Sequence, residues 1–270
     1  MRFIPRSPEE GINVSKEHPL VEAGTLIVGI GLIFAVIAVA LIFLVEIAIY
    51  FIPAEKEVAL FEDWMPTDIV VVAEGDERSH AVDSVLKRLS RHYPDSPYTF
   101  RIAIDDSEFM NAMALPGGLI VLTAGLLDAV KTENELAFII GHELGHFKNR
   151  DHMRALGRGV VLGILFVAIS GSGAGSNYGA SIADLALRGF SRSQEASADE
   201  FGLSIVHKEF SHVADSWRFF ERIDEGEGEL LKLMSYLSTH PSPDDRVDAL
   251  IMLAGENGWS ISGELTPLDW

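Results

Sequence analysis

The sequence predicts an α+β fold, mostly helical with a small sheet, that follows one N-terminal transmembrane helix. Three observations support this fold class: a long uncharged apolar run near the N-terminus, two short β-type stretches in mid-chain, and helical apolar spacing through much of the remainder. With 270 residues, the chain is long enough for a membrane helix and a domain with a buried core. We therefore expect an N-terminal segment (1–23), a membrane anchor (24–53) and one domain (54–270).

The run from Leu26 to Val45 contains 20 residues and no charge. A helix of that length spans about 30 Å, which is the thickness of the bilayer's hydrocarbon core. Glu46 then interrupts the run, and Tyr50 and Phe51 follow where interfacial aromatic residues are common. The sequence therefore predicts a single-pass helix in contact with the lipid bilayer.

Basic residues are unevenly distributed about this run. Arg2, Arg6 and Lys16 precede it, whereas Lys56 is the one basic residue in the first twenty after Pro53. Because cytoplasmic flanks carry an excess of Lys and Arg, the N-terminus is expected in the cytoplasm and the domain on the exported side.

Composition excludes several classes of protein. The chain has no cysteine, so no disulfide scaffold, cysteine nucleophile or cysteine metal ligand is possible. Its net charge of −19 argues against nucleic-acid binding, which requires a basic surface. A second apolar stretch, Val160 to Ile169, is too short to span a bilayer, and it either packs in the core or lies against the membrane surface.

Local patterns then predict the elements of the domain in order. Glu77 to His92 has helical apolar spacing, and Tyr98 to Ile104 alternates like a strand. Pro116-Gly117-Gly118 marks a turn before a second strand, Leu119 to Thr123, which suggests a hairpin. Thr132 and Glu135 form a capping box at the start of a helix that runs to Arg150. Later helices are expected at Gln194–His207, His212–Asp224, Glu229–Leu237 and Pro243–Ala254.

The capped helix carries the sequence His142-Glu143-Leu144-Gly145-His146. Histidines at positions i and i+4 lie on one helical face and can direct two nitrogens at one Zn²⁺ ion. Glu143 neighbours that face and can act as a general base on a water molecule.

A catalytic zinc site needs a third protein ligand, and the sequence offers two candidates. His152 lies ten residues after His142 and produces a metzincin-like pattern, with Asn149 in place of glycine. Glu195 lies on a later helix, with Asp199 one turn further along, where it could hydrogen-bond a ligating histidine.

Four stretches together resemble one known family. They are NAMALPGGLIVLTAGLL (Asn111–Leu127), HELGH (His142–His146), SRSQEASAD (Ser191–Asp199) and STHPSPDDR (Ser238–Arg246). Their order is similar to that in the gluzincin family that contains HtpX, the CAAX prenyl proteases and the Oma-type mitochondrial protease, which are membrane-associated zinc metallopeptidases. The resemblance covers about Tyr98 to Ala254 and implies a zincin-like (minigluzincin) metallopeptidase domain.

The resemblance also implies roles for individual residues. His142, His146 and Glu195 would hold one Zn²⁺ per chain, and Glu143 would act as general base and acid. His240 would lie near the metal and stabilise the oxyanion.

Supporting roles follow from the same resemblance. Asp199 would orient a ligand histidine, and Arg246 would hold the segment around His240. The sheet edge that receives an extended substrate would be the strand of Leu119, Ile120, Val121, Leu122 and Thr123.

The single anchor differs from the several spans of HtpX and from the multi-pass chamber of the prenyl proteases. It resembles instead a bacterial inner-membrane quality-control protease. We therefore expect a membrane-anchored zinc endopeptidase that cleaves extended or misfolded protein substrates. The alternatives are a metzincin-like peptidase with His152 as third ligand, and a catalytically silent membrane scaffold or chaperone-like binder.

Overall fold

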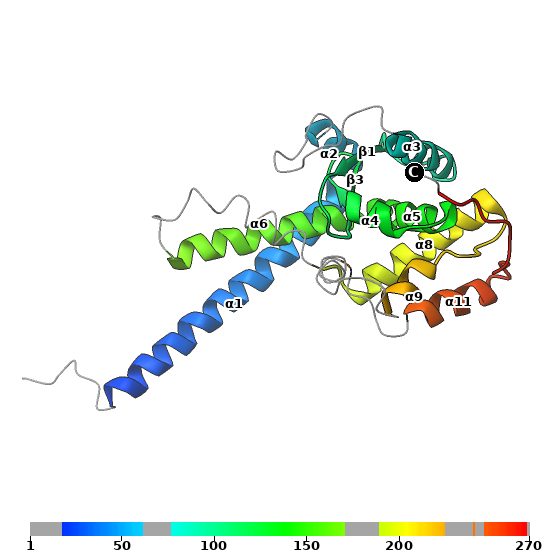
Figure 1. Ribbon diagram of the computed structural model, residues 1–270. Helices are drawn as coiled ribbons and strands as arrows, with labels where there is room; N and C mark the ends of the chain where they lie inside the picture. The colour runs from blue at the N-terminus through cyan, green and yellow to red at the C-terminus, as the bar shows by residue number, and fades with distance from the viewer. Residues whose placement is uncertain (1–17, 62–76, 171–188, 225–239, 241–245, 269–270) are drawn as a thin grey trace, which may run out of the picture.

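The computed structural model describes residues 18–61, 77–170, 189–224, 240 and 246–268 (Figure 1). These residues are mostly helical with one three-stranded sheet, which confirms the predicted fold class. The elements in chain order are α1 (Pro19–Phe51), α2 (Ala54–Phe61), α3 (Glu77–Ser90), β1 (Arg101–Asp105), β2 (Ala112–Leu115), β3 (Leu119–Thr123), α4 (Ala124–Ala129), α5 (Glu133–Asn149), α6 (Asp151–Ser170), α8 (Arg192–Phe210), α9 (Arg218–Asp224) and α11 (Arg246–Glu256).

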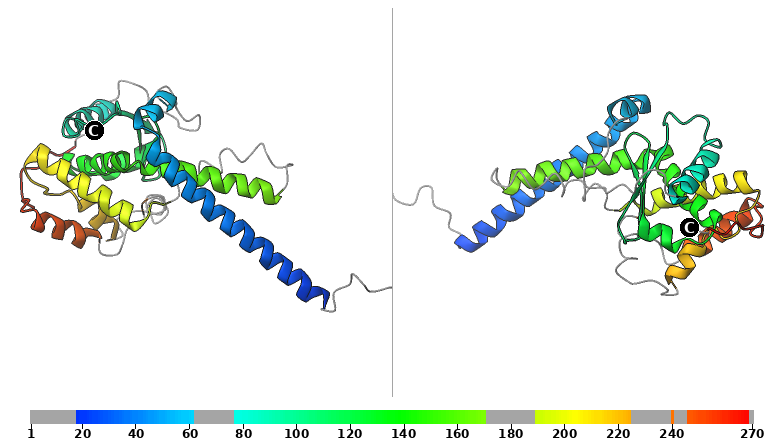
Figure 2. Two further views of the ribbon diagram at one scale, coloured as in Figure 1. Left: turned by 180° about the vertical axis from the view of Figure 1, so that it is seen from behind. Right: turned by 45° about the horizontal axis from the view of Figure 1, so that its top comes forward.

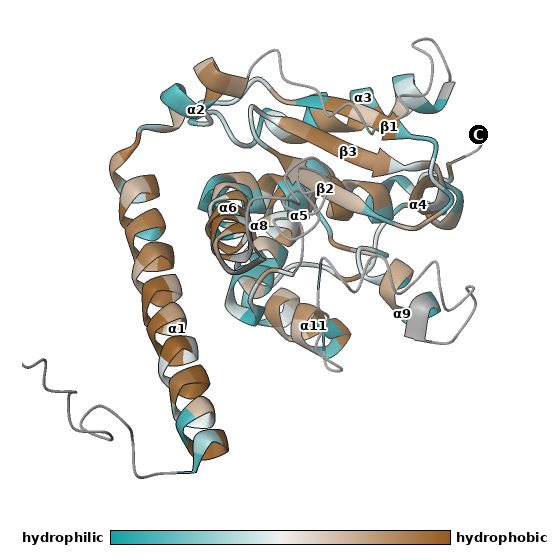
Figure 3. Ribbon diagram, turned by 90° about the vertical axis from the view of Figure 1, so that its left-hand side faces the viewer, coloured by the Kyte–Doolittle hydropathy of each residue, from teal (hydrophilic) through white to brown (hydrophobic). Residues whose placement is uncertain are grey.

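Helix α1 projects from the domain as a long rod, and Figure 3 shows its hydrophobic colouring along most of its length. It has 33 residues, and Pro19 occupies its first turn, where the missing amide hydrogen costs nothing. Within the described part of the chain it is the one helix long and apolar enough to cross a membrane. The predicted membrane segment is thus one continuous helix.

The sheet has the strand order β1-β3-β2. β1 pairs with β3 in parallel, whereas β2 pairs with β3 antiparallel, with Ala112 opposite Leu122. The hairpin is therefore formed by β2 and β3 across the predicted turn, and the hairpin expected between Tyr98–Ile104 and Leu119–Thr123 is wrong. Strand β2 was missed because Ala112–Leu115 has few of the β-branched and aromatic residues that mark strands.

The same topology corrects the expectation that Leu119, Ile120, Val121, Leu122 and Thr123 form the sheet edge. β3 lies between the other two strands, and all five of its residues are buried. Its apolar run without alternation is typical of a strand covered on both faces. Among the described residues, β2 forms the edge on one side and β1 on the other.

Two glycines make the β2–β3 turn possible. Gly117 and Gly118 have φ values of 81° and 84°, in the left-handed region that side chains disfavour. A Cβ atom at Gly117 would also lie 2.4 Å from the carbonyl oxygen of Phe61 in α2. The turn therefore packs directly against α2, the helix that follows α1.

Most predicted helices are present with shifted ends. α3 follows the expected span to Ser90, α5 starts after the Thr132 cap, and α8 starts earlier than expected. The span His212–Asp224 is helical only in α9, because Asp215 adopts a left-handed φ of 66° that interrupts it. The expected helix Glu229–Leu237 and the start of Pro243–Ala254 lie outside the described residues.

The core lies between the sheet and the helices α3, α5 and α8. Phe138 and Phe147 of α5 are fully buried, with Leu122 of β3 and Leu86 of α3 in the same cluster. The apolar stretch Val160–Ile169 is not in this core. It forms the second half of α6, which packs against α1 outside the domain (Figure 2).

Candidate metal centre

Helix α5 carries the first two candidate ligands into the middle of the domain. The Thr132 hydroxyl accepts a hydrogen bond from the Glu135 amide at 3.3 Å and so caps its N-terminus. His142, Glu143 and His146 are all buried, with at most 1% of their surface exposed. Since buried polar side chains require partners, the surroundings of these three residues decide what the site can do.

Helix α8 approaches α5 very closely because small residues face one another. A Cβ atom added at Gly145 would lie 2.7 Å from the Cα of Ala198, and one at Gly202 would lie 2.8 Å from the backbone nitrogen of His142. Only glycine permits these distances. The close approach brings Glu195 of α8 beside the two histidines of α5.

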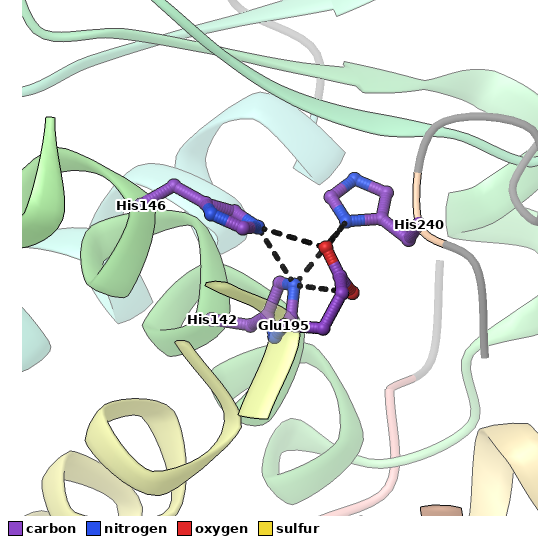
Figure 4. A group of neighbouring side chains, drawn as sticks. All are labelled: His142, His146, Glu195 and His240. Carbon is purple, nitrogen blue, oxygen red and sulfur yellow. Dashed lines mark hydrogen bonds and ion pairs between the residues drawn. The ribbon is translucent and has the colours of Figure 1, made fainter. Parts of the chain in front are cut away.

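Four side chains converge in this place, as Figure 4 shows. The Nε2 atoms of His142 and His146 are 3.1 Å apart, and each lies 3.5 Å from a carboxylate oxygen of Glu195. His240 contributes its Nδ1 atom, 3.2 Å from His142 Nε2 and 3.3 Å from Glu195 Oε1. One ligand atom from each residue lies within 4.8 Å of all the others, and all four residues are buried.

Two aspartates fix how the histidines present their nitrogens. The Nδ1 atom of His142 lies 2.8 Å from Asp199 Oδ1, and that of His146 lies 3.0 Å from Asp151 Oδ2. A carboxylate accepts the Nδ1 hydrogen, so the neutral rings carry their lone pairs on Nε2. Two such lone pairs meet at short range only if a cation or a proton lies between them.

The donor set fits zinc. Two nitrogens bound tetrahedrally at 2.0–2.1 Å would be about 3.3 Å apart, close to the 3.1 Å between the two Nε2 atoms. Glu195 Oε2 is buried and, among the described residues, has no hydrogen-bond partner. A nitrogen and oxygen donor set with one unsatisfied carboxylate oxygen is what a zinc ion would complete.

Burial and neighbouring charges shift the pKa values of the residues in the cluster. Burial opposes a charge on His146, but its hydrogen bonds with Asp151 and Glu195 outweigh burial and raise its pKa to about 9. Burial lowers the pKa of His142. Burial is likewise outweighed at Glu195, where the neighbouring histidines hold the pKa well below its usual range. A proton thus competes with a metal cation for the same nitrogens.

Asp151 contacts a candidate ligand, although no sequence pattern pointed to it. Besides His146, it accepts a hydrogen bond at 2.6 Å from Gln194 Nε2, and the amide oxygen of Gln194 caps the start of α8 through Ser191. Asp151 directly follows Arg150, which ends α5 with a left-handed φ of 56°. That turn brings the next carboxylate back toward the face of His146.

Arg246, which was expected to hold the segment around His240, contacts Asp199, whereas residues 241–245 of that segment lie outside the described residues. Its Nε and NH2 atoms donate to the two oxygens of Asp199 at 3.0 and 2.6 Å, and its guanidinium stacks 4.2 Å from the centre of the Phe220 ring. Burial alone would raise the pKa of Asp199, but the charge of Arg246 and the bond with His142 hold it below its ordinary value. Asp199 therefore remains an anion that can orient His142.

Glu143 lies beside the cluster with both carboxylate oxygens buried. Among the described residues neither oxygen has a hydrogen-bond partner, although His240 Nε2 lies 3.6 Å from Oε1. A buried carboxylate without hydrogen bonds is costly unless a ligand or a water molecule completes it. Its place is next to the cluster and outside the group of four donors.

His240 also reaches the sheet. Its Nε2 atom donates to the carbonyl oxygen of Ala112 in the edge strand β2 at 3.2 Å. His240 therefore links the edge strand β2 directly to the cluster.

His152, the other candidate third ligand, lies in a different place. Its Nε2 atom is 2.6 Å from Glu57 Oε1, in a buried group that also includes Tyr98 and Arg150. Glu57 belongs to α2, the helix that follows α1. The structure thus joins Glu195, and not His152, to the pair on α5.

A helix with two histidines and a neighbouring glutamate, completed by a glutamate from a second helix, defines the site of a zinc metallopeptidase. The family comparison agrees: the model of peptidase family M48 matches residues 76–254, and the chain belongs to this family.

Individual relatives carry related names. The chain is 31% identical over 205 residues to the mitochondrial metalloendopeptidase OMA1 of Danio rerio and 30% identical over 212 residues to that of Homo sapiens. These alignments cover 69% and 70% of this chain but only 43% and 40% of the relatives. Metalloprotease LoiP of Escherichia coli is 25% identical over 193 residues, which is 67% of this chain and 73% of LoiP.

Proposed function

We propose that this protein is a membrane-anchored zinc-dependent endopeptidase that cleaves extended or misfolded protein substrates. The observation that carries the proposal is the convergence of His142, His146 and Glu195, with Glu143 beside them, whose carboxylate has no hydrogen-bond partner in the described part of the chain. The names of the M48 relatives support the same reaction.

The chemistry divides between the metal and the chain. When bound, zinc polarises the scissile carbonyl and makes a water molecule more acidic. Glu143 would accept the proton of the attacking water and deliver it to the leaving amine. The N–H that His240 directs at Ala112 of β2 would donate to the oxyanion of a chain lying along that strand.

Substrate would bind along the edge strand β2. An extended chain that adds to a sheet edge is held through main-chain hydrogen bonds, which tolerate many sequences. This mode suits unfolded segments and supports a role in protein quality control. The edge lies next to the metal donors, because the Ala112 carbonyl is hydrogen-bonded to His240.

The anchor would be α1, with its N-terminus in the cytoplasm and the catalytic domain on the exported side of a bacterial inner membrane. Its length and apolar composition support the span, and the basic residues Arg2, Arg6 and Lys16 before it support the orientation.

The direct test replaces the general base in the full chain. Glu143→Gln should bind zinc like the natural protein but cleave unfolded casein about 10²–10⁴-fold more slowly, the usual worth of general acid–base catalysis. Zinc content is the second readout: Glu195→Ala should lose the metal, whereas His152→Ala should keep it. Unchanged cleavage by Glu143→Gln would refute its role. Loss of zinc in His152→Ala alone would favour the metzincin-like site, and zinc binding without cleavage by the natural chain would favour a silent binder.

A further inference from the structure

Helix α6 leaves the domain on the same side as α1, and the two helices cross near their domain ends (Figures 1 and 2). The crossing is close because Gly157 faces Val45. A Cβ atom at position 157 would lie 2.3 Å from Val45 Cγ1. The first half of α6 is therefore fitted to the last turns of the membrane helix.

A charged layer accompanies this crossing. Glu46 of α1 pairs with Arg154 at 3.3 Å and with Arg158 at 3.9 Å. Glu46 is the first charged residue after the apolar run of α1, so it marks the level at which that run meets the membrane surface. The two arginines place the middle of α6 at the same level.

Beyond Arg158 the character of α6 changes. No charged residue occurs from Gly159 to Ser170, and Val160, Leu162, Ile164 and Val167 are between 38% and 58% exposed. This half extends from the domain on the same side as the N-terminal part of α1 (Figures 1 and 2). It therefore lies on the side of the charged layer where the apolar run of α1 also lies. Water is an unfavourable neighbour for such a surface.

We propose that the second half of α6 inserts into the same bilayer as α1 and ends inside one leaflet. The inference rests on the proposed membrane anchoring. From Val160 to Ile169 the helix rises about 15 Å, half of the hydrocarbon core of about 30 Å. The acyl chains of the leaflet next to the domain thus cover the exposed apolar face of α6. The protein then contacts the membrane through one spanning helix and one half-inserted helix.

The absence of cysteine from the sequence makes a clean experiment possible. Three single-cysteine variants of the full chain, Ile164→Cys, Val36→Cys and Met252→Cys, are labelled with an environment-sensitive fluorophore and reconstituted into phosphatidylcholine–phosphatidylglycerol vesicles. Residue 36 lies in α1, whereas Met252 of α11 is a matched exposed apolar control at 64% exposure. Some vesicles carry a spin-label quencher near the headgroup, and others carry it near the chain end.

Position 164 should be quenched several-fold more than position 252, and more strongly by the shallow quencher than by the deep one. Position 36, about 15 Å along α1 from Glu46, should show the reverse preference. Equal, weak quenching at 164 and 252 beside strong quenching at 36 would overturn the insertion of α6 while leaving the anchor intact. Cross-linking between two copies at position 164 without quenching would overturn it in favour of a dimer contact.

A different result would show that α1 does not span the membrane. Absence of quenching at position 36 would refute the membrane span of α1 and the inference that depends on it. Peptide cleavage in detergent by the same labelled proteins reports on the proposed activity independently of either result.

Discussion

At the scale of single residues, the site depends on carboxylates that do not touch the metal. Asp199 and Asp151 each hold one histidine by its Nδ1 atom, so that the Nε2 nitrogens face the place where the four donors converge and would hold a zinc ion. The two are supported differently: Arg246 neutralises Asp199, whereas Gln194 and the cap of α8 position Asp151. Orientation of the ligands is therefore distributed over several elements.

Asp151→Asn should lower zinc affinity about 10–100-fold, the usual effect of removing a carboxylate that orients a ligand histidine. The change removes a negative charge while preserving size, so the fold should persist. Competition with a chelator measures the affinity. Asp128→Asn is the control, since Asp128 is an exposed residue paired with Arg78, and it should bind zinc normally. Equal affinities would show that Asp151 does not orient His146.

At the scale of elements, the distance between α5 and α8 determines whether the third ligand reaches the metal. Gly141 and Gly145 on one helix face Gly202 and Ala198 on the other, which allows backbone contact. Glu195 lies one and two turns from Ala198 and Gly202 on α8, so this close approach places its carboxylate beside the histidines.

Gly202→Ala should therefore separate the helices. Its Cβ atom would lie 2.8 Å from the His142 nitrogen, and overpacking of this kind costs about 1–3 kcal/mol. We expect both thermal stability and zinc affinity to fall. Gly255→Ala in α11 is the matched control: its Cβ atom would meet nothing within 4 Å, so it should stabilise the protein by up to about 1 kcal/mol. A stable Gly202→Ala variant with full zinc affinity would contradict this role for the interface.

Sequence patterns predicted what depends on local spacing. His142 and His146 could be assigned from one helical turn, and the cap at Thr132 from four residues. The parallel pairing of β1 with β3 could not be predicted, because strand direction depends on how the chain crosses between them. Strand β2 could not be predicted either, because its sequence has few residues that favour strands. Asp151 and Glu57 were missed for a related reason: their contacts need the turn after α5 and a partner 95 residues away.

At the scale of the whole molecule, a group of polar side chains joins α1 to α5, the helix that carries His142 and His146. Glu57 accepts hydrogen bonds from Tyr98 at 2.9 Å and Arg150 at 3.2 Å and contacts His152 at 2.6 Å. Arg150 also donates to the carbonyl oxygens of Ile49 and Ile52 at the end of α1. Arg150, the residue that ends α5, thus contacts the end of α1 directly.

This group makes stability depend on pH. Burial opposes the charge of Glu57, but His152, Tyr98 and Arg150 outweigh burial and hold its pKa below the ordinary value of 4.5. A lowered pKa stabilises the fold at pH above 4.5, and the contribution is lost as pH falls through the folded-state pKa. Glu57→Gln should therefore lower the Tm at pH 7 and differ less from the natural protein in acid.

Thermal unfolding in detergent at several pH values measures the effect. Glu55→Gln, on the exposed side of the same helix, is the control and should follow the natural protein throughout. A deficit for Glu57→Gln that stays constant down to strongly acidic pH would show that its carboxylate charge is not the source.

The bridge made by Arg150 has a geometrical consequence. A domain joined to a membrane helix by a flexible linker could take many orientations and could bind substrate chains far from the bilayer. Here the guanidinium fastens the last carbonyls of α1 to the end of the helix that bears His142 and His146. Under the proposed anchoring, the distance and tilt of the candidate metal centre relative to the bilayer would consequently be set by the fold and not by a linker.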